Sequence, residues 1–220
     1  MQFFKDFESR RQDQNESTML MMTERAQGPF RGRGSALHQL ELAIAHEEGL
    51  SVENHRRRSS HQVNYIAAFS GIGKTRLLSE LPEALRHSPT LFHREFIFVT
   101  YNNNSNLRKD EIDTIPNSST RFAVRLLWAY FSRGQAWGDF YPQFQSLNVT
   151  IPTVLQLISE NCATSDSSRN SSLSLVLLID EFQRESQESL SDILKELMEI
   201  AQTPAIEQGV SCAGFRVSWA

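Results

Sequence analysis

The chain has 220 residues, a formal net charge of −4, and 40% hydrophobic and 22% charged residues. This length suits one globular domain with its own core, and the composition excludes a collagen, a coiled coil or a wholly disordered chain. The negative net charge excludes a global basic field that would attract nucleic acid or acidic lipid. Two cysteines, Cys162 and Cys212, are too few for a disulfide scaffold, so we expect both to be reduced.

The chain lacks the apolar segments that direct proteins to membranes. No apolar run reaches the roughly 20 residues that a membrane-spanning helix needs. Residues 1–15 also lack the apolar stretch of a signal peptide. We therefore expect an intracellular protein, in the cytoplasm or the nucleus, that does not contact a membrane. Residues 1–27 are polar and predict a loose leader, and residues 28–220 predict the folded domain.

Helical spacing of apolar residues alternates along the chain with short, continuous apolar runs. In chain order, the pattern predicts a helix over residues 35–48, a strand over 63–69, a helix from 77 that Pro82 bends or restarts, a strand over 95–101, helices over 120–131 and 151–161, a strand over 173–179 and a helix over 188–202. The polar segment 102–119 and the aromatic segment 132–150 predict irregular structure. Strands that alternate with helices indicate the α/β class, with a parallel sheet and helices on its faces.

The segment between the first strand and the next helix resembles the Walker A motif of P-loop nucleotide triphosphatases. Its residues are Ala68, Phe69, Ser70, Gly71, Ile72, Gly73, Lys74 and Thr75, followed by Arg76. Gly71 and Gly73 permit backbone angles that other residues avoid, so successive N–H groups can surround a phosphate. The following helix directs its free N–H groups and its positive dipole end at the same anion. Ala68 departs from the motif, which usually begins with glycine.

The Walker A resemblance implies that these nine residues bind the nucleotide. Lys74 would contact the β- and γ-phosphates, and the Thr75 hydroxyl would bind Mg²⁺. The alternative interpretation is a glycine-rich turn with a solvated lysine.

A second apolar run ends in two carboxylates and resembles the Walker B motif. Residues 175–179 are all apolar, and Asp180 and Glu181 follow them directly. Ligands of α/β sheets gather at the carboxyl ends of strands. We expect Asp180 to hold Mg²⁺ through water and Glu181 to polarise the water that attacks the γ-phosphate. The alternative is that the two acids only cap the next helix.

A glutamate directly after the Walker B aspartate is similar to the pattern in AAA+ and STAND ATPases. The segment Phe30-Arg31-Gly32-Arg33 resembles a loop that lies near the adenine in those families, with a plain turn as the alternative. The phosphate loop at residues 71–76, the strand end at residues 100–102 and residues 121–127 of the next helix look like the ATPase module of Crinkler-type and retrotransposon-hot-spot-type proteins. This resemblance covers roughly residues 28–200.

The resemblance implies a three-layer P-loop sandwich with parallel strands in the order 5-1-4-3-2. In that order, the strand after Walker B lies between the Walker A and Walker B strands. Residues 215–219 are the candidate for it, with Arg216 or Ser218 near the phosphate. The interpretation we favour from the sequence is a fold that is incomplete at its C-terminus and stops after the helix at 188–202.

These patterns predict an ATP-binding domain that uses Mg²⁺ to hydrolyse ATP to ADP and phosphate if it is catalytically competent. Lys74 and Glu181 are the predicted catalytic residues. The alternative from another class is a non-catalytic switch, whose nucleotide state displays a surface to a protein partner or to a second copy of the chain. A third alternative is a DNA-associated ATPase, suggested by the three arginines at positions 56–58.

Overall fold

The structure is a computed structural model that describes eleven stretches of the chain. These are residues 34–49, 64–67, 74–85, 92–101, 105–132, 134–145, 147–165, 172–180, 185–202, 210–211 and 215–219. Several predicted features lie outside the described residues: the leader at 1–27, the segment at 30–33, the arginines at 56–58 and Cys212.

The described residues form a series of helices and strands whose order follows the prediction closely. The helical segments are α3 (Gly34–Glu48), α5 (Lys74–Leu85), α6 (Lys109–Thr114), α7 (Ser118–Phe131), α8 (Trp137–Phe140), the 3-10 helix η3 (Tyr141–Phe144), α9 (Ile151–Ser165) and α10 (Gln187–Gln202). The strands are β1 (Asn64–Ala67), β2 (Phe92–Thr100), β3 (Ser172–Asp180), β4 (Val210–Ser211) and β5 (Phe215–Trp219).

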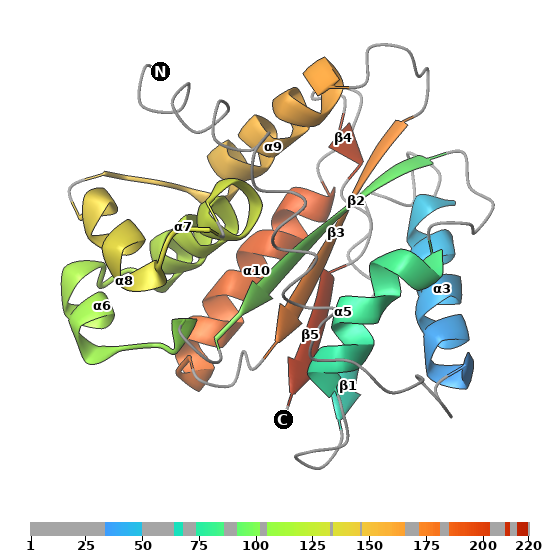
Figure 1. Cartoon of the computed structure of the whole chain (residues 1–220), viewed down its shortest axis with the longest axis horizontal. Helices are drawn as coiled ribbons and strands as arrows, with labels where there is room; N and C mark the ends of the chain where they lie inside the picture. Colours follow the sequence, from blue (N-terminus) through green and yellow to red (C-terminus); the bar gives the residue numbers. More distant parts are fainter. Residues whose placement is uncertain are drawn as a thin grey trace.

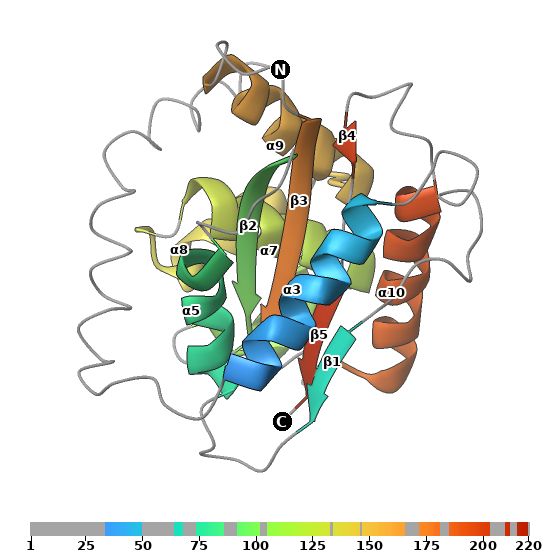
Figure 2. The ribbon, with the colours of Figure 1, turned by 90° about the vertical axis from the view of Figure 1, so that its right-hand side faces the viewer.

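The strands form one parallel sheet with helices on both sides. The strand order is β1-β5-β3-β2, and the short β4 pairs with the start of β3. Helices α3 and α5 lie on one side of the sheet, and α7, α9 and α10 lie on the other (Figure 1 and Figure 2). The predicted α/β class with a parallel sheet is confirmed. No helix among the described residues is long and apolar enough to cross a membrane.

Strand β5 occupies the position between β1 and β3. Its register pairs Val217 with Tyr65 on one side and with Ile179 on the other. The favoured expectation of a fold that stops after the helix at 188–202 is therefore wrong, since residues 215–219 complete the middle of the sheet. Residues 215–219 form a strand there because the facing edges of β1 and β3 carry backbone N–H and C=O groups that need hydrogen-bond partners.

Alternate residues of β2 and β3 face opposite sides of the sheet and enter two separate hydrophobic cores. Phe98 lies beside Leu178, and both belong to the core formed with α3 and α5. Ile97 lies beside Leu177, and both belong to the core formed with α7, α9 and α10. Both faces of these strands are buried, which explains why the two runs are apolar without alternation.

Helix α5 is continuous through Pro82, so the predicted restart is absent. A proline inside a helix costs about 3 kcal/mol. Full burial of one leucine side chain stabilises the fold by about 1.5–3 kcal/mol. The apolar stripe of α5 outweighs the proline, because it buries Leu77, Leu78, Leu81 and Leu85.

The prediction of irregular structure was wrong for two segments, which form α6 and the pair α8–η3. These helices span only four to six residues each, too few to show a helical period in the sequence. Packing stabilises such short helices, since isolated ones are marginal in water. The buried aromatic side chains of the second segment are Trp137, Phe140, Tyr141 and Phe144.

Leu177→Ala is expected to lower the free energy of unfolding by about 2–5 kcal/mol, because the side chain is 1% exposed and its loss leaves a cavity. Urea unfolding followed by circular dichroism measures this change. Leu42→Ala is the matched control, since Leu42 is 50% exposed and should change stability by no more than about 0.5 kcal/mol. Equal losses in the two variants would contradict the position of β3 in the core.

Candidate functional site

The carboxyl ends of the long strands meet at one edge of the sheet. β1, β5, β3 and β2 all run parallel, and Thr100 pairs with Asp180 where β2 and β3 end. Helix α5 begins at Lys74, after the link that follows the end of β1 at Ala67. This edge is where the resemblance to nucleotide-binding α/β folds places a ligand.

A hydrogen bond joins the two predicted magnesium ligands. Thr75 Oγ1 donates to Asp180 Oδ2 at 2.9 Å, across 105 positions of sequence. Asp180 is 1% exposed, whereas Thr75 is exposed. The start of α5 and the end of β3 therefore meet at this edge.

Part of the predicted site lies outside the described residues. This part comprises Ala68, Phe69, Ser70, Gly71, Ile72, Gly73, Glu181 and the side chain of Lys74. The backbone of Lys74 is the first residue of α5. Arg76 Nε donates to Glu80 Oε1 at 2.6 Å, so this arginine has a partner one turn further along α5.

The oxygen atoms of Thr75 and Asp180 suit Mg²⁺. This ion prefers octahedral oxygen ligands at about 2.1 Å, of which one or two are carboxylates and several are waters. Thr75 Oγ1 and Asp180 Oδ2 are hydrogen-bonded at 2.9 Å, so a hydroxyl that could bind Mg²⁺ directly lies beside a carboxylate that could bind it through water. Among the described residues, no group of three or more His, Cys, Asp or Glu side chains could hold a metal ion.

Thr100 belongs to this edge, although the sequence did not single it out as a site residue. Its Oγ1 lies 3.5 Å from Asp180 Oδ2. The backbone N–H of Tyr101 donates to Asp180 O at 3.1 Å. The end of β2 therefore contacts both the side chain and the backbone of Asp180. The sequence did contain a signal for Thr100, since it is a polar residue near the end of a predicted parallel strand. The carboxyl ends of parallel strands share one edge of the sheet, where Asp180 also lies.

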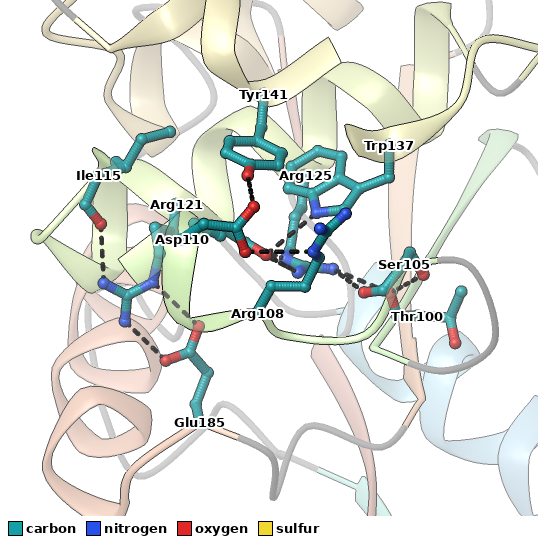
Figure 3. Close-up of polar contacts among 11 residues, drawn as sticks. Thr100, Ser105, Arg108, Asp110, Ile115, Arg121, Arg125, Trp137, Tyr141 and Glu185 are labelled. Carbon is teal, nitrogen blue, oxygen red and sulfur yellow. Dashed lines mark hydrogen bonds and ion pairs between the residues drawn. The ribbon is translucent and has the colours of Figure 1, made fainter. Parts of the chain in front are cut away.

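Arg125 of α7 lies directly behind the end of β2 (Figure 3). Its Nη1 donates to the carbonyl oxygens of Ser105 at 2.7 Å and Thr100 at 3.3 Å. Its Nε and Nη2 donate to the Glu111 carboxylate at 2.6–3.0 Å. The same carboxylate accepts a hydrogen bond from Trp137 Nε1 at 3.0 Å. The guanidinium carbon is 4.4 Å from the centre of the Trp137 ring, within the range of a cation–π contact.

Arg121, one turn earlier on α7, binds a second buried glutamate. Its Nη2 donates to Glu185 Oε2 at 2.8 Å. Its Nη1 donates to the carbonyl oxygens of Ile115 at 2.9 Å and Pro116 at 2.7 Å. Two arginines in a helix whose other residues are largely apolar were the sequence signal for these buried pairs.

Two tyrosines near this network have raised pKa values. Burial raises the pKa of Tyr101, whose ring centre lies 4.2 Å from the guanidinium carbon of Arg125. Burial and the hydrogen bond to Asp110 raise the pKa of Tyr141 to about 12. The same hydrogen bond lowers the pKa of Asp110. At neutral pH both phenols are therefore protonated and Asp110 is ionised.

The chain was compared with protein-family models, curated protein sequences and solved structures, and none of the three comparisons found a match.

Proposed function

We propose that the chain is a P-loop ATPase module that binds ATP with Mg²⁺ at the carboxyl edge of its sheet. The observation that carries the proposal is the hydrogen bond between Thr75 and Asp180. It joins the two side chains that the Walker A and Walker B resemblances assign to Mg²⁺. The strand order β1-β5-β3-β2 supports the proposal, since it agrees with the 1-4-3-2 part of the order that AAA+ and STAND ATPases imply.

Each predicted residue has a chemical role in this proposal. Backbone N–H groups of residues 68–73 and of the start of α5 bind the phosphates, and Lys74 compensates their charge. Thr75 and Asp180 hold Mg²⁺, which offsets phosphate charge when it is bound. Glu181 accepts a proton from the attacking water, so that ATP is cleaved to ADP and phosphate.

Thr75→Ala is expected to abolish the gain in ATP affinity that Mg²⁺ provides. Even residues that only support a metal ligand contribute about 10–100-fold to metal affinity, so loss of a direct ligand should cost about tenfold or more. Calorimetric titration of ATP, with Mg²⁺ and with a chelator, measures the difference. Thr75→Ser is the matched control, because it keeps the hydroxyl and should keep the gain.

The Mg²⁺ dependence of ATP affinity is compared among the wild type, Thr75→Ala and Thr75→Ser to test whether Thr75 binds the ion. If Mg²⁺ increases the ATP affinity of the wild type and of Thr75→Ser but not of Thr75→Ala, the proposal is supported. If ATP does not bind to the folded wild-type protein, the proposal fails. Equal Mg²⁺ dependence in all three proteins would show that Thr75 is not a ligand.

A further inference from the structure

Two buried arginines connect α7 to the edge that carries Asp180. The side chains of Arg121 and Arg125 are 4% and 1% exposed. Removing such a charge from water is costly, and only good geometry with further hydrogen bonds offsets the cost. The proposed function assigns neither arginine a role in binding or chemistry.

The hydrogen bonds of Arg125 extend beyond what neutralising its charge requires. Glu111 alone supplies a carboxylate that accepts from both Nε and Nη2. The remaining Nη1 donates to the carbonyls of Thr100 and Ser105, and Ser105 Oγ donates to the same Thr100 carbonyl at 2.9 Å. Arg125 therefore holds both ends of the link that follows β2, directly beside Asp180 (Figure 3).

Arg121 forms an ion pair with a residue in the segment that follows β3. Its partner Glu185 lies five positions after Asp180, and the Glu185 side chain is 1% exposed. The forked contact between these two side chains anchors the far end of the link after Asp180. The two carbonyl contacts of Arg121, to Ile115 and Pro116, fix its guanidinium to the segment between α6 and α7.

We propose that Arg121 and Arg125 are positioning residues, through which α7 fixes the ends of β2 and β3 and thereby sets the affinity of the edge for Mg²⁺ and nucleotide. The metal part of this inference rests on the proposed function. Neither arginine contacts the reacting groups. Arg125 holds the Thr100 carbonyl beside Asp180, and Arg121 holds Glu185, five positions after Asp180, so that the chain on both sides of the Asp180 carboxylate keeps its place.

The test uses Arg125→Lys, Arg121→Lys and Ser105→Ala in the full chain. Lysine keeps the positive charge but lacks the planar fork that binds a carboxylate and carbonyls together. Ser105→Ala removes one hydrogen bond to Thr100 O and is a mild change that preserves folding. Arg108→Gln is the matched control, because it breaks an exposed ion pair with Asp110 in the same segment.

Two measurements are made on each folded variant. Calorimetry of ATP with Mg²⁺ and with a chelator should show that Arg125→Lys lowers the Mg²⁺-dependent gain about tenfold, with no change in Arg108→Gln. Amide hydrogen exchange without nucleotide should show faster exchange at residues 92–105 in Arg125→Lys and Ser105→Ala. Peptides from α9 are the internal reference, because a merely structural role would lower protection there as well.

The outcomes separate this inference from the proposed function. Selective loss of protection at residues 92–105 together with weaker Mg²⁺ dependence supports the inference. Unchanged Mg²⁺ dependence in folded Arg125→Lys and Arg121→Lys overturns it, whatever the exchange shows. If the wild type shows no Mg²⁺-dependent binding, the proposed function fails, and the exchange data alone decide whether Arg125 holds the end of β2.

Discussion

Lys74→Ala is expected to lower the affinity for ATP by about 10–100-fold. The lysine is the first residue of α5 and belongs to the helix whose next residue contacts Asp180. In the proposed function, its ammonium group donates charge-assisted hydrogen bonds to the phosphates. Hydrogen bonds to charged groups contribute about 1.5–3 kcal/mol, and each 1.4 kcal/mol corresponds to a tenfold change in affinity. Calorimetric titration with ATP measures the loss.

Lys195→Ala is the control for this experiment. Lys195 is an exposed lysine of α10, and its substitution changes the net charge of the chain by the same amount. ATP affinity should be unchanged in this variant. If the two variants lose affinity equally, only the overall charge of the protein matters. If Lys74→Ala binds ATP like the wild type, the loop does not act as a phosphate site.

Glu181→Gln is expected to lower the rate of ATP hydrolysis by about 100-fold or more, the scale for losing a positioned general base. The substitution keeps the size and hydrogen bonding of the side chain but removes the charge that activates water. Thr75, Asp180 and Lys74 are unchanged, so ATP and Mg²⁺ should still bind. Phosphate release under single-turnover conditions measures the rate, and calorimetry measures binding.

Glu188→Gln is the matched control, because Glu188 is an exposed glutamate in the first turn of α10. Equal turnover in the wild type and Glu181→Gln, both above the uncatalysed background, would show that Glu181 only caps the following helix. Absence of turnover in both proteins, with ATP still bound, would favour the non-catalytic switch over the hydrolase.

The sequence predicted β3 and α5 because the patterns that indicate them lie within short stretches of the chain. Residues 175–179 before Asp180 are all apolar, and the structure contains β3 over residues 172–180. The helical pattern predicted α5 from residue 77, and the structure begins this helix three residues earlier, at Lys74. The meeting of Thr75 with Asp180 could be predicted because parallel strands share a carboxyl edge, although 105 positions separate the two residues.

The partners of the two buried arginines could not be predicted, because these ion pairs depend on contacts between distant segments. An amphipathic helical pattern indicates charged residues at the surface, but Arg121 and Arg125 lie in the interior of the fold. Glu111, the partner of Arg125, comes from the short helix α6, which the sequence pattern does not show. Whether residues 215–219 form a strand was also open, because these five residues pair only where β1 and β3 provide edges.

The position of β5 has a consequence for the order of events during folding. Among the described residues, β1 pairs with β5, so that Asn64 has Arg216 as its partner. While the chain is synthesised from its N-terminus, residues 64–67 emerge early but cannot join the sheet until residues 215–219 are available. Pairing between such distant segments requires closure of a long loop, which slows folding. We therefore expect β2 and β3 to pair first, and β1 to remain an unpaired apolar segment that chaperones can bind.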